Sequence, residues 1–253
     1  MSRETILDFH ARLAPRPGAL DLLLADMKRA GVQRAAVAAG GVIDLDVLAG
    51  QVVEGGHSEA DPDNDLVLDA CARSDGQLIP FFFANPHRPV GHYRGRAAEF
   101  RALELSPAVH GVGLDDPRTT RLVEVAAEFG HPVYTVCLTR PGAGVADLVR
   151  LAGAFPGTHF VLGHCGVSLI DTHALGLVAD LPNILVETSG GYTHLVRLAV
   201  SRLGADRLLF AAEHPLQPPA VELAKFRALN LDPETWRRIA WENAHRILGE
   251  EIP

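Results

Sequence analysis

Short apolar runs recur along the chain at intervals of roughly 30 residues, which is the length of one strand-and-helix unit. Each run is almost continuously apolar, a pattern typical of strands buried on both faces of a parallel sheet. The eight runs are Thr5–Asp8, Arg34–Ala38, Leu78–Phe83, Val109–Leu114, Pro132–Cys137, His159–Leu162, Ile184–Thr188 and Leu208–Ala211. The pattern therefore predicts eight parallel strands.

Amphipathic segments with helical spacing lie in most of the gaps between these runs. Several end at a glycine just before the next strand, where a tight helix-to-strand turn favours glycine. The segments are Leu20–Ala30, Leu66–Ala72, Thr119–Phe129, Val145–Ala154, Leu175–Leu181, Leu195–Leu203 and Pro219–Leu229. Helices that alternate with strands indicate an α/β protein with right-handed crossovers.

Eight strand-and-helix units use all 253 residues, so the sequence predicts one domain, residues 1–253, folded as a (β/α)8 TIM barrel. An open doubly wound sheet is the alternative. That fold usually carries a glycine-rich phosphate loop after its first strand, and here the position reads DFHARLAP. The barrel is therefore favoured. The longest connection, Gly40–Asp63, has the length typical of a functional lid.

Charge and composition narrow the class of protein. The formal net charge is −8, with 23 basic and 31 acidic residues, which disfavours binding to nucleic acid or to an anionic membrane surface. Three cysteines are too few for a disulfide framework. The chain starts MSRETILDFHARL, without the apolar run of a signal peptide, and no stretch has the apolar length of a membrane span. We expect a soluble, cytoplasmic protein that acts on a small molecule.

Polar side chains follow several of the predicted strands at the point where each strand ends. His10 and Arg12 follow the first strand, His164 the sixth and Glu213 the eighth. In a TIM barrel the carboxyl ends of all strands meet at one face, where the catalytic groups lie. These four residues are the candidate catalytic groups.

A second set of polar residues is predicted on the loops around the same face. Arg140, His87, His57 and Ser189 are the candidate substrate-binding residues. An arginine there can hold a carboxylate through two parallel hydrogen bonds. The sequence does not decide whether the substrate is acidic or largely apolar.

Several segments together resemble the amidohydrolase superfamily, in particular the amidohydrolase-related branch that includes aminocarboxymuconate-semialdehyde decarboxylase and pyrone-dicarboxylate lactonase. They are ILDFHARL, HPVYTVC, VLGHCG, PNILVETSGG, LGADRLLFAAEHPL and ENAHRILG, spread over nearly the whole chain. The resemblance implies a TIM barrel and an enzyme.

The resemblance also implies a divalent metal, held by an HxH pair on strand 1, a histidine on strand 5 and an aspartate on strand 8. This chain keeps His10 but has Arg12 in the second position, Val136 on strand 5 and Glu213 on strand 8. A catalytic zinc site typically has three protein ligands, and a guanidinium repels a dication. We therefore expect no tightly bound metal and no other cofactor, although a weak zinc site at His10, His164 and Glu213 stays open.

The remaining groups predict a metal-independent hydrolase of an ester, lactone, thioester or amide of a small organic acid. Pyrone-dicarboxylate lactonase, which this chain resembles in lacking the strand-5 histidine, implies Glu213 as general base. His164 is then its acid or polarising partner, and His10 with Arg12 forms the electrostatic side.

Two alternatives stay open: a non-oxidative decarboxylase, or other lyase or isomerase, on the same site, and a non-catalytic barrel used for binding. Members of the family are often dimers, and the predicted helix Trp236–Leu248 offers an apolar face, so a homodimer is also possible.

Overall fold

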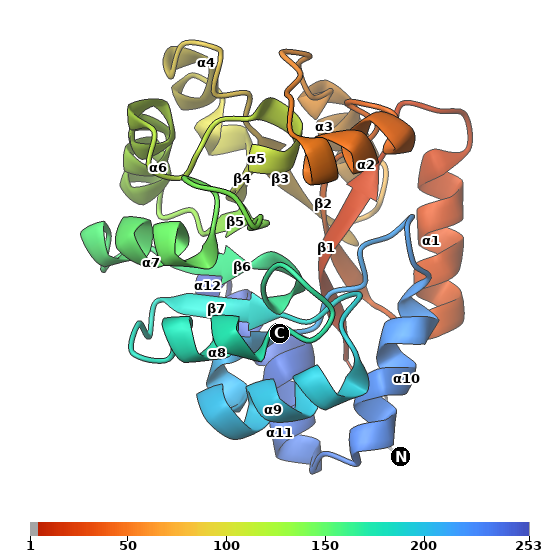
Figure 1. The fold of residues 1–253 in the computed structure, drawn as a ribbon. Helices are drawn as coiled ribbons and strands as arrows, with labels where there is room; N and C mark the ends of the chain where they lie inside the picture. The colour runs from red at the N-terminus through yellow and green to blue at the C-terminus, as the bar shows by residue number, and fades with distance from the viewer. Residues whose placement is uncertain (1–4, 253) are drawn as a thin grey trace.

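The computed structural model describes residues 5–252 and has eight parallel strands in one sheet, in the order of the chain. The strands are β1 Leu7–Leu13, β2 Arg34–Ala39, β3 Leu78–Phe83, β4 Ala102–Leu105, β5 Val133–Thr135, β6 Phe160–Leu162, β7 Ile184–Glu187 and β8 Leu208–Leu209. The backbone N–H of Phe9 donates to Phe210 (2.8 Å) and that of Arg12 to His214 (2.7 Å), which joins β1 to the chain at and beyond β8. The prediction of a single-domain TIM barrel is confirmed (Figure 1).

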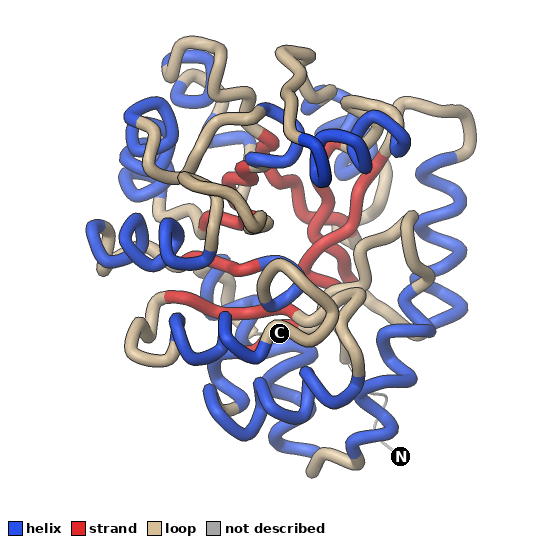
Figure 2. Tube along the Cα trace, in the orientation of Figure 1, coloured by secondary structure: helices blue, strands red, loops and turns tan. Residues whose placement is uncertain are grey.

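Helices surround the barrel as an outer layer (Figure 2). The α-helices are α1 Ala19–Ala30, α2 Leu45–Glu54, α3 Asn64–Ala72, α4 Gly91–Arg94, α5 Pro107–His110, α6 Pro117–Phe129, α7 Val145–Ala154, α8 Thr172–Val178, α9 Thr193–Leu203, α10 Pro219–Leu229, α11 Pro233–Arg237 and α12 Asn243–Leu248. Short 3-10 turns cover Ala97–Glu99, Gly163–Cys165 and Ala205–Arg207, and a π-helical turn covers Arg238–Glu242. Among residues 5–252 no helix has the length and apolar character needed to cross a membrane.

The core has two parts, as expected for strands that are buried on both faces. The larger part lies between the strands and the helices. The smaller part includes Leu7, Phe9, Phe81 and Leu209, together with Trp241 from the C-terminal segment. Because Trp241 is 6% exposed and belongs to this core, the apolar face considered for a dimer packs against the barrel. A homodimer stays a prediction.

The predicted fourth strand, Val109–Leu114, is wrong. The segment that starts at Pro107 forms α5, whose N-terminus is capped by the Ser106 side chain accepting from the Val109 N–H, and α5 ends at Gly111 in the left-handed region. Strand β4 is instead Ala102–Leu105, immediately before that helix. Because β4 is Ala102–Leu105, it is Glu104 that this strand contributes to the barrel.

Strand β1 is longer than predicted and contains an irregularity. Its pairing with β2 advances by three residues from Asp8 to Ala11 while β2 advances by two, which is a β-bulge. The bulge lies at the residues that bring His10 into the barrel. His10 and Arg12 therefore belong to the strand itself and not to the loop that follows.

The long connection after β2 contains α2, which sequence analysis had treated as part of a loop. Gly41 precedes this helix with φ +69°, and Gly55 and Gly56 follow it with φ +91° and +122°. A side chain would be strained at these angles. Helix α2 lies near the carboxyl end of β1, beside α5 (Figure 1).

Candidate active site

A cavity of about 740 Å³ lies at the carboxyl ends of the strands. Arg12, His164, Ser189 and Glu213 contribute polar atoms to its lining. The apolar lining comes from Ala39, Val42, Ile43, Leu45, Leu48, Val52, Phe83, Ala108, Val109, Val136, Leu138, Val167, Leu169 and Leu216, among others. Three of the four predicted catalytic side chains therefore reach one cavity, and the fourth, His10, is buried directly beneath it in contact with Glu213.

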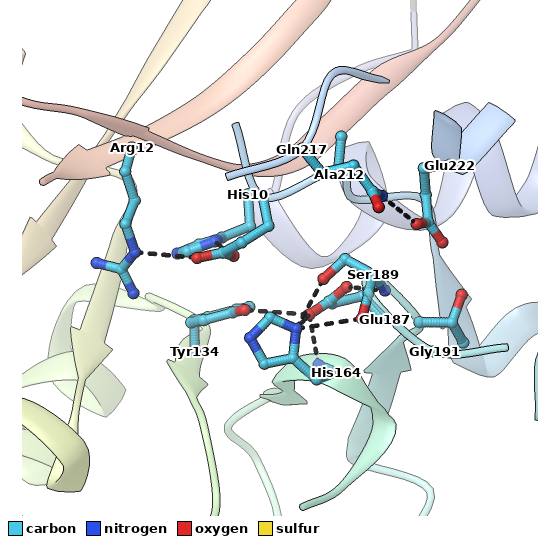
Figure 3. Close-up of polar contacts among 12 residues, drawn as sticks. His10, Arg12, Tyr134, His164, Glu187, Ser189, Gly191, Ala212, Gln217 and Glu222 are labelled. Atoms are coloured by element: carbon cyan, nitrogen blue, oxygen red, sulfur yellow. Dashed lines mark hydrogen bonds and ion pairs between the residues drawn. The ribbon is translucent and has the colours of Figure 1, made fainter. Parts of the chain in front are cut away.

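Four charged side chains form a closed ring at the floor of the cavity, which we call the charge ring: His10, Arg12, Glu104 and Glu213. His10 Nδ1 donates to Glu213 Oε2 (2.5 Å) and His10 Nε2 to Glu104 Oε2 (3.1 Å). Arg12 Nε donates to Glu213 Oε1 (3.1 Å) and Arg12 Nη2 to Glu104 Oε1 (2.5 Å). Figure 3 shows Arg12 and His10 side by side, joined through a carboxylate. The ring ties together β1, β4 and the segment after β8.

Both ring nitrogens of His10 face carboxylate oxygens, which only accept hydrogen bonds when ionised. Burial lowers the pKa of His10, but the charges of Glu213 and Glu104 outweigh it and raise the pKa to about 10. Burial likewise raises the pKa of Glu213, but His10 and Arg12 lower it well below its ordinary value. The pKa of Glu104 is also lowered, because Arg12 and His10 outweigh its burial. The charge ring thus holds two cations and two anions, and its charges balance.

Tyr134 supports the charge ring from β5. Its ring stacks on His10 with centroids 3.9 Å apart and an angle of 5° between the planes, the arrangement of a cation over an aromatic face. Tyr134 Oη donates to Glu187 Oε1 (3.1 Å). A Cβ at Gly163 would lie 2.5 Å from Tyr134 Oη, so only glycine allows this approach. Burial raises the pKa of Tyr134 well above its ordinary value and keeps the phenol protonated.

His164 presents one ring nitrogen to the cavity and keeps the other in a fixed hydrogen bond. Its Nδ1 lies 2.8 Å from Ser189 Oγ and 3.2 Å from the backbone carbonyl oxygen of Ser189. A carbonyl oxygen only accepts, so Nδ1 carries the hydrogen, and Nε2 has the free lone pair. Figure 3 shows this second nitrogen pointing away from Ser189 and Glu187. The Glu187 carboxylate is 3.7 Å from Nδ1 and favours the same tautomer.

The loops that carry His164 and Ser189 are held by further contacts. Glu187 accepts from the backbone N–H of His164 (2.6 Å) and of Ser189 (2.8 Å). Lys225 Nζ donates to the carbonyl oxygens of Thr188 and Gly191, on either side of Ser189. These bonds fix where the two side chains lie in the cavity.

His164 and Glu213 share an unusual backbone conformation. Their φ angles are +56° and +62°, in the left-handed region that residues with a Cβ rarely adopt. Such a conformation costs on the order of 1–3 kcal/mol and persists where the surroundings determine it. Its occurrence at two residues that line the cavity supports a functional role for both.

The structure does not bring the other three predicted substrate-binding residues into the cavity lining. Arg140 donates to the carbonyl oxygens of Gln51 (3.2 Å) and Pro107 (2.7 Å), so it ties α2 to α5. His87 Nε2 donates to the carbonyl oxygen of His110 (2.8 Å), and His57 stacks beside His87 with centroids 5.5 Å apart. Of that set only Ser189 lies in the cavity.

Sequence analysis missed Glu104, which completes the charge ring. Its signal is a single acidic residue inside the short apolar run ALEL, which was passed over in favour of the longer run VHGVGL seven residues later. It also gave no role to Tyr134. Stacking between residues 10 and 134 has no signature in the sequence.

The fold agrees with comparisons to known proteins. A family model described as amidohydrolase matches residues 7–249, so the chain belongs to the amidohydrolase family. The predicted resemblance is confirmed at this level. A search of curated proteins gives no match.

Solved structures of this family share the barrel. A 5-carboxyvanillate decarboxylase from Novosphingobium aromaticivorans with bound manganese has a TM-score of 0.72 and 18% identity over 97% of each chain. A 2,6-dihydroxybenzoate decarboxylase from Rhizobium has a TM-score of 0.69 and 17% identity over 98% of this chain and 99% of that one. A probable 2-pyrone-4,6-dicarboxylic acid hydrolase from Acinetobacter baumannii has a TM-score of 0.71 and 13% identity over 96% and 99%. At these identities the comparison shows the fold.

The residues at the site do not fit the divalent metal that some relatives hold. Both nitrogens of His10 are bonded to carboxylates, and the Arg12 guanidinium bridges the two carboxylates that would otherwise be free to coordinate. Val136 lines the cavity without a lone pair to donate. Nowhere in residues 5–252 do three His, Cys, Asp or Glu side chains converge as metal ligands. The weak zinc site considered at His10, His164 and Glu213 is therefore not formed by this arrangement.

Proposed function

We propose that this member of the amidohydrolase family is a metal-independent hydrolase that cleaves an ester, lactone, thioester or amide of a small organic acid. The observation that carries the proposal is the charge ring, in which the Arg12 guanidinium is bonded to both carboxylates. A fixed cation thus lies beside Glu213 and His164 at the floor of the cavity.

His164 is the general base in this proposal. Its Nε2 lone pair faces the cavity, and Ser189 holds the required tautomer. Glu213 is a weak base because its pKa is lowered by His10 and Arg12. Glu213 keeps free acceptor sites, so its part is to accept a hydrogen bond from the attacking water and orient it.

The reaction then needs one water and no further reactant. His164 Nε2 takes a proton from the water as its oxygen attacks the substrate carbonyl carbon. Arg12 has five N–H donors and uses three of them within the protein, so others remain for the oxygen that becomes negative. The C–O, C–S or C–N bond breaks, and the leaving group takes the proton from the His164 imidazolium. The products are the acid and the alcohol, thiol or amine.

A decarboxylase reaction on the same residues is the second candidate, and the family includes such enzymes. It would require a group that binds the carboxylate of the substrate. The charge of Arg12 is already balanced by Glu104 and Glu213, so its remaining N–H donors would bind a substrate carboxylate without a net ion pair, which disfavours this candidate.

Kinetics of two variants and a metal analysis test the proposal. We expect His164→Asn to lower kcat with a panel of esters and lactones by about 100-fold or more, as for loss of a general base. The matched control His173→Asn changes an exposed histidine of α8 and should leave kcat unchanged.

Three results would contradict the proposal. The first is zinc or manganese at one equivalent in the purified protein, with activity lost when the metal is removed. The second is release of carbon dioxide in place of a mass gain of one water. The third is turnover by His164→Asn at the rate of the unmodified protein.

A further inference from the structure

We propose that the substrate has an uncharged, apolar body that extends from the charge ring to the rim of the cavity; this inference rests on the proposed function and specifies the acid part of the substrate. It concerns the walls of the cavity, which the reaction itself does not use.

The first observation is that the cation at the floor of the cavity already has two carboxylate partners. The cation at the floor, Arg12, has 19% of its side chain exposed and bonds Glu104 and Glu213. Arg140 lies outside the lining and bonds two backbone carbonyl oxygens. A substrate carboxylate placed at the floor would therefore lose its hydration while Arg12 stays paired with Glu104 and Glu213, which is unfavourable.

The second observation is the chemistry of the walls between floor and rim. The walls are lined by apolar side chains from separate elements, namely Val42, Ile43, Leu48, Phe83, Val109, Val136, Leu138 and Val167. Alkyl or aromatic groups are recognised by such surfaces through burial alone, at about fourfold in affinity for each fully buried methylene. The cavity volume of about 740 Å³ is within the range that holds ligands of drug size.

The third observation is that the apolar wall continues to the rim. Leu45 and Val52 of α2, Leu169 after β6 and Leu216 after β8 all line the cavity and are 45% to 60% exposed. Single exposed apolar side chains are common, but four around one opening mark a binding surface. The charged rim residues Arg16 and Asp44 are exposed and opposite in sign, so they give no net preference for an ionic ligand.

Two matched pairs of ligands test this inference. The first pair is 2-nonanone and 8-oxononanoic acid, which have the same chain and differ in a terminal carboxylate, and their binding is measured by calorimetry. The second pair is the p-nitrophenyl esters of octanoic acid and of octanedioic acid, the latter as its half ester. We expect the neutral member of each pair to be favoured at least about tenfold, in Kd or in kcat/KM. The octanoate ester should also exceed the butanoate ester at least about tenfold.

Two variants of α2 locate the effect. Leu45→Arg places a cation on the cavity wall, and we expect it to shift the preference toward the carboxylated ligands by at least about tenfold. The control Val53→Arg adds the same charge to the same helix, but Val53 is 83% exposed and is not part of the lining. It should keep the preference of the unmodified protein.

The outcomes separate this inference from the proposed hydrolase. If 2-nonanone is favoured and no ester is cleaved, the apolar site stands and the hydrolase proposal fails. If the half ester is cleaved faster than the octanoate, the hydrolase stands and the apolar substrate is overturned. Equal binding of both ligands, or an equal shift in both variants, also overturns it.

Discussion

Arg12 stands at the position where the family resemblance implies a metal-binding histidine. Its contacts explain how two carboxylates can be buried together at this site. Two carboxylates buried together repel each other, and each would otherwise be protonated. Arg12 and His10 supply two positive charges that hold Glu104 and Glu213 ionised. Three members of this ring, His10, Arg12 and Glu213, are the residues that the sequence placed at strand ends as candidate catalytic groups, and their catalytic role stays a prediction. Glu104 was missed because the fourth strand was predicted at Val109–Leu114, so the short run that contains Glu104 was not considered as a strand.

Removal of the Glu104 charge should destabilise the protein strongly. Glu104→Gln leaves Arg12 and His10 facing a single carboxylate, and breaking a buried ion pair costs about 3–5 kcal/mol. We expect a loss of about 3 kcal/mol in the free energy of unfolding, measured with urea. The control Glu99→Gln changes an exposed carboxylate that pairs with Arg96, and should cost less than about 1 kcal/mol. Equal losses in both variants would show that the ring is not a stabilising unit.

Helix α2 forms one wall of the cavity and is held at its end by a residue from another loop. Arg140 was predicted to bind substrate because it follows a strand, and strand ends point to the cavity face. Arg140 instead donates to the carbonyl oxygens of Gln51, in the connection between β2 and β3, and of Pro107, just after β4. The sequence does not show that these two segments meet Arg140. Glycines in the left-handed region lie at both ends of α2, so its attachment depends on contacts such as these.

Loss of Arg140 should loosen α2 without altering the barrel. A hydrogen bond from a charged donor contributes about 1.5–3 kcal/mol, so Arg140→Ala should speed amide hydrogen exchange in Leu45–Glu54 by about tenfold or more. Mass spectrometry of peptides from this segment measures the rate. The control Arg88→Ala removes a rim arginine that pairs with Asp61 and should leave exchange in α2 unchanged. If hydrogen exchange in α2 is unchanged in Arg140→Ala but KM is raised, Arg140 binds substrate and does not hold α2.

The folded barrel keeps His10 protonated, so the free energy of unfolding depends on pH. The pKa of His10 is raised in the folded protein to about 10, from an ordinary value of 6.5. A raised pKa means that the folded protein binds a proton that the unfolded chain releases between these two values. The stabilisation is complete below about pH 6.5 and is lost as the pH rises toward 10. Burial also raises the pKa values of Asp8 and Glu222 to about 7. These two groups therefore also lower the stability as the pH rises, but they do so at a lower pH than His10.

The free energy of unfolding should therefore fall between pH 7 and pH 10. One proton gives a slope of at most about 1.4 kcal/mol per pH unit. We expect His10→Gln to have lower stability at pH 7 and a flatter profile, because the titrating group is gone. His92→Gln, a change at an exposed histidine, should reproduce the unmodified profile. Parallel profiles for His10→Gln and the unmodified protein, measured by urea unfolding at each pH, would contradict a protonated His10.

The chain pattern alone was sufficient to predict the barrel and the order of its strands, because burial of both faces of a parallel sheet imposes an apolar run at each strand. It misplaced the fourth strand, and with it Glu104. The sequence also predicts that a metal would lack ligands, because Arg12 and Val136 cannot coordinate one, and the absence of a metal stays a prediction. Contacts between distant residues required the tertiary structure. The bond from Glu104 to Arg12 spans 92 residues, and the stacking of Tyr134 on His10 depends on which face of each strand turns inward. The local pattern of apolar and polar residues does not predict such pairings, because they form only when the barrel closes.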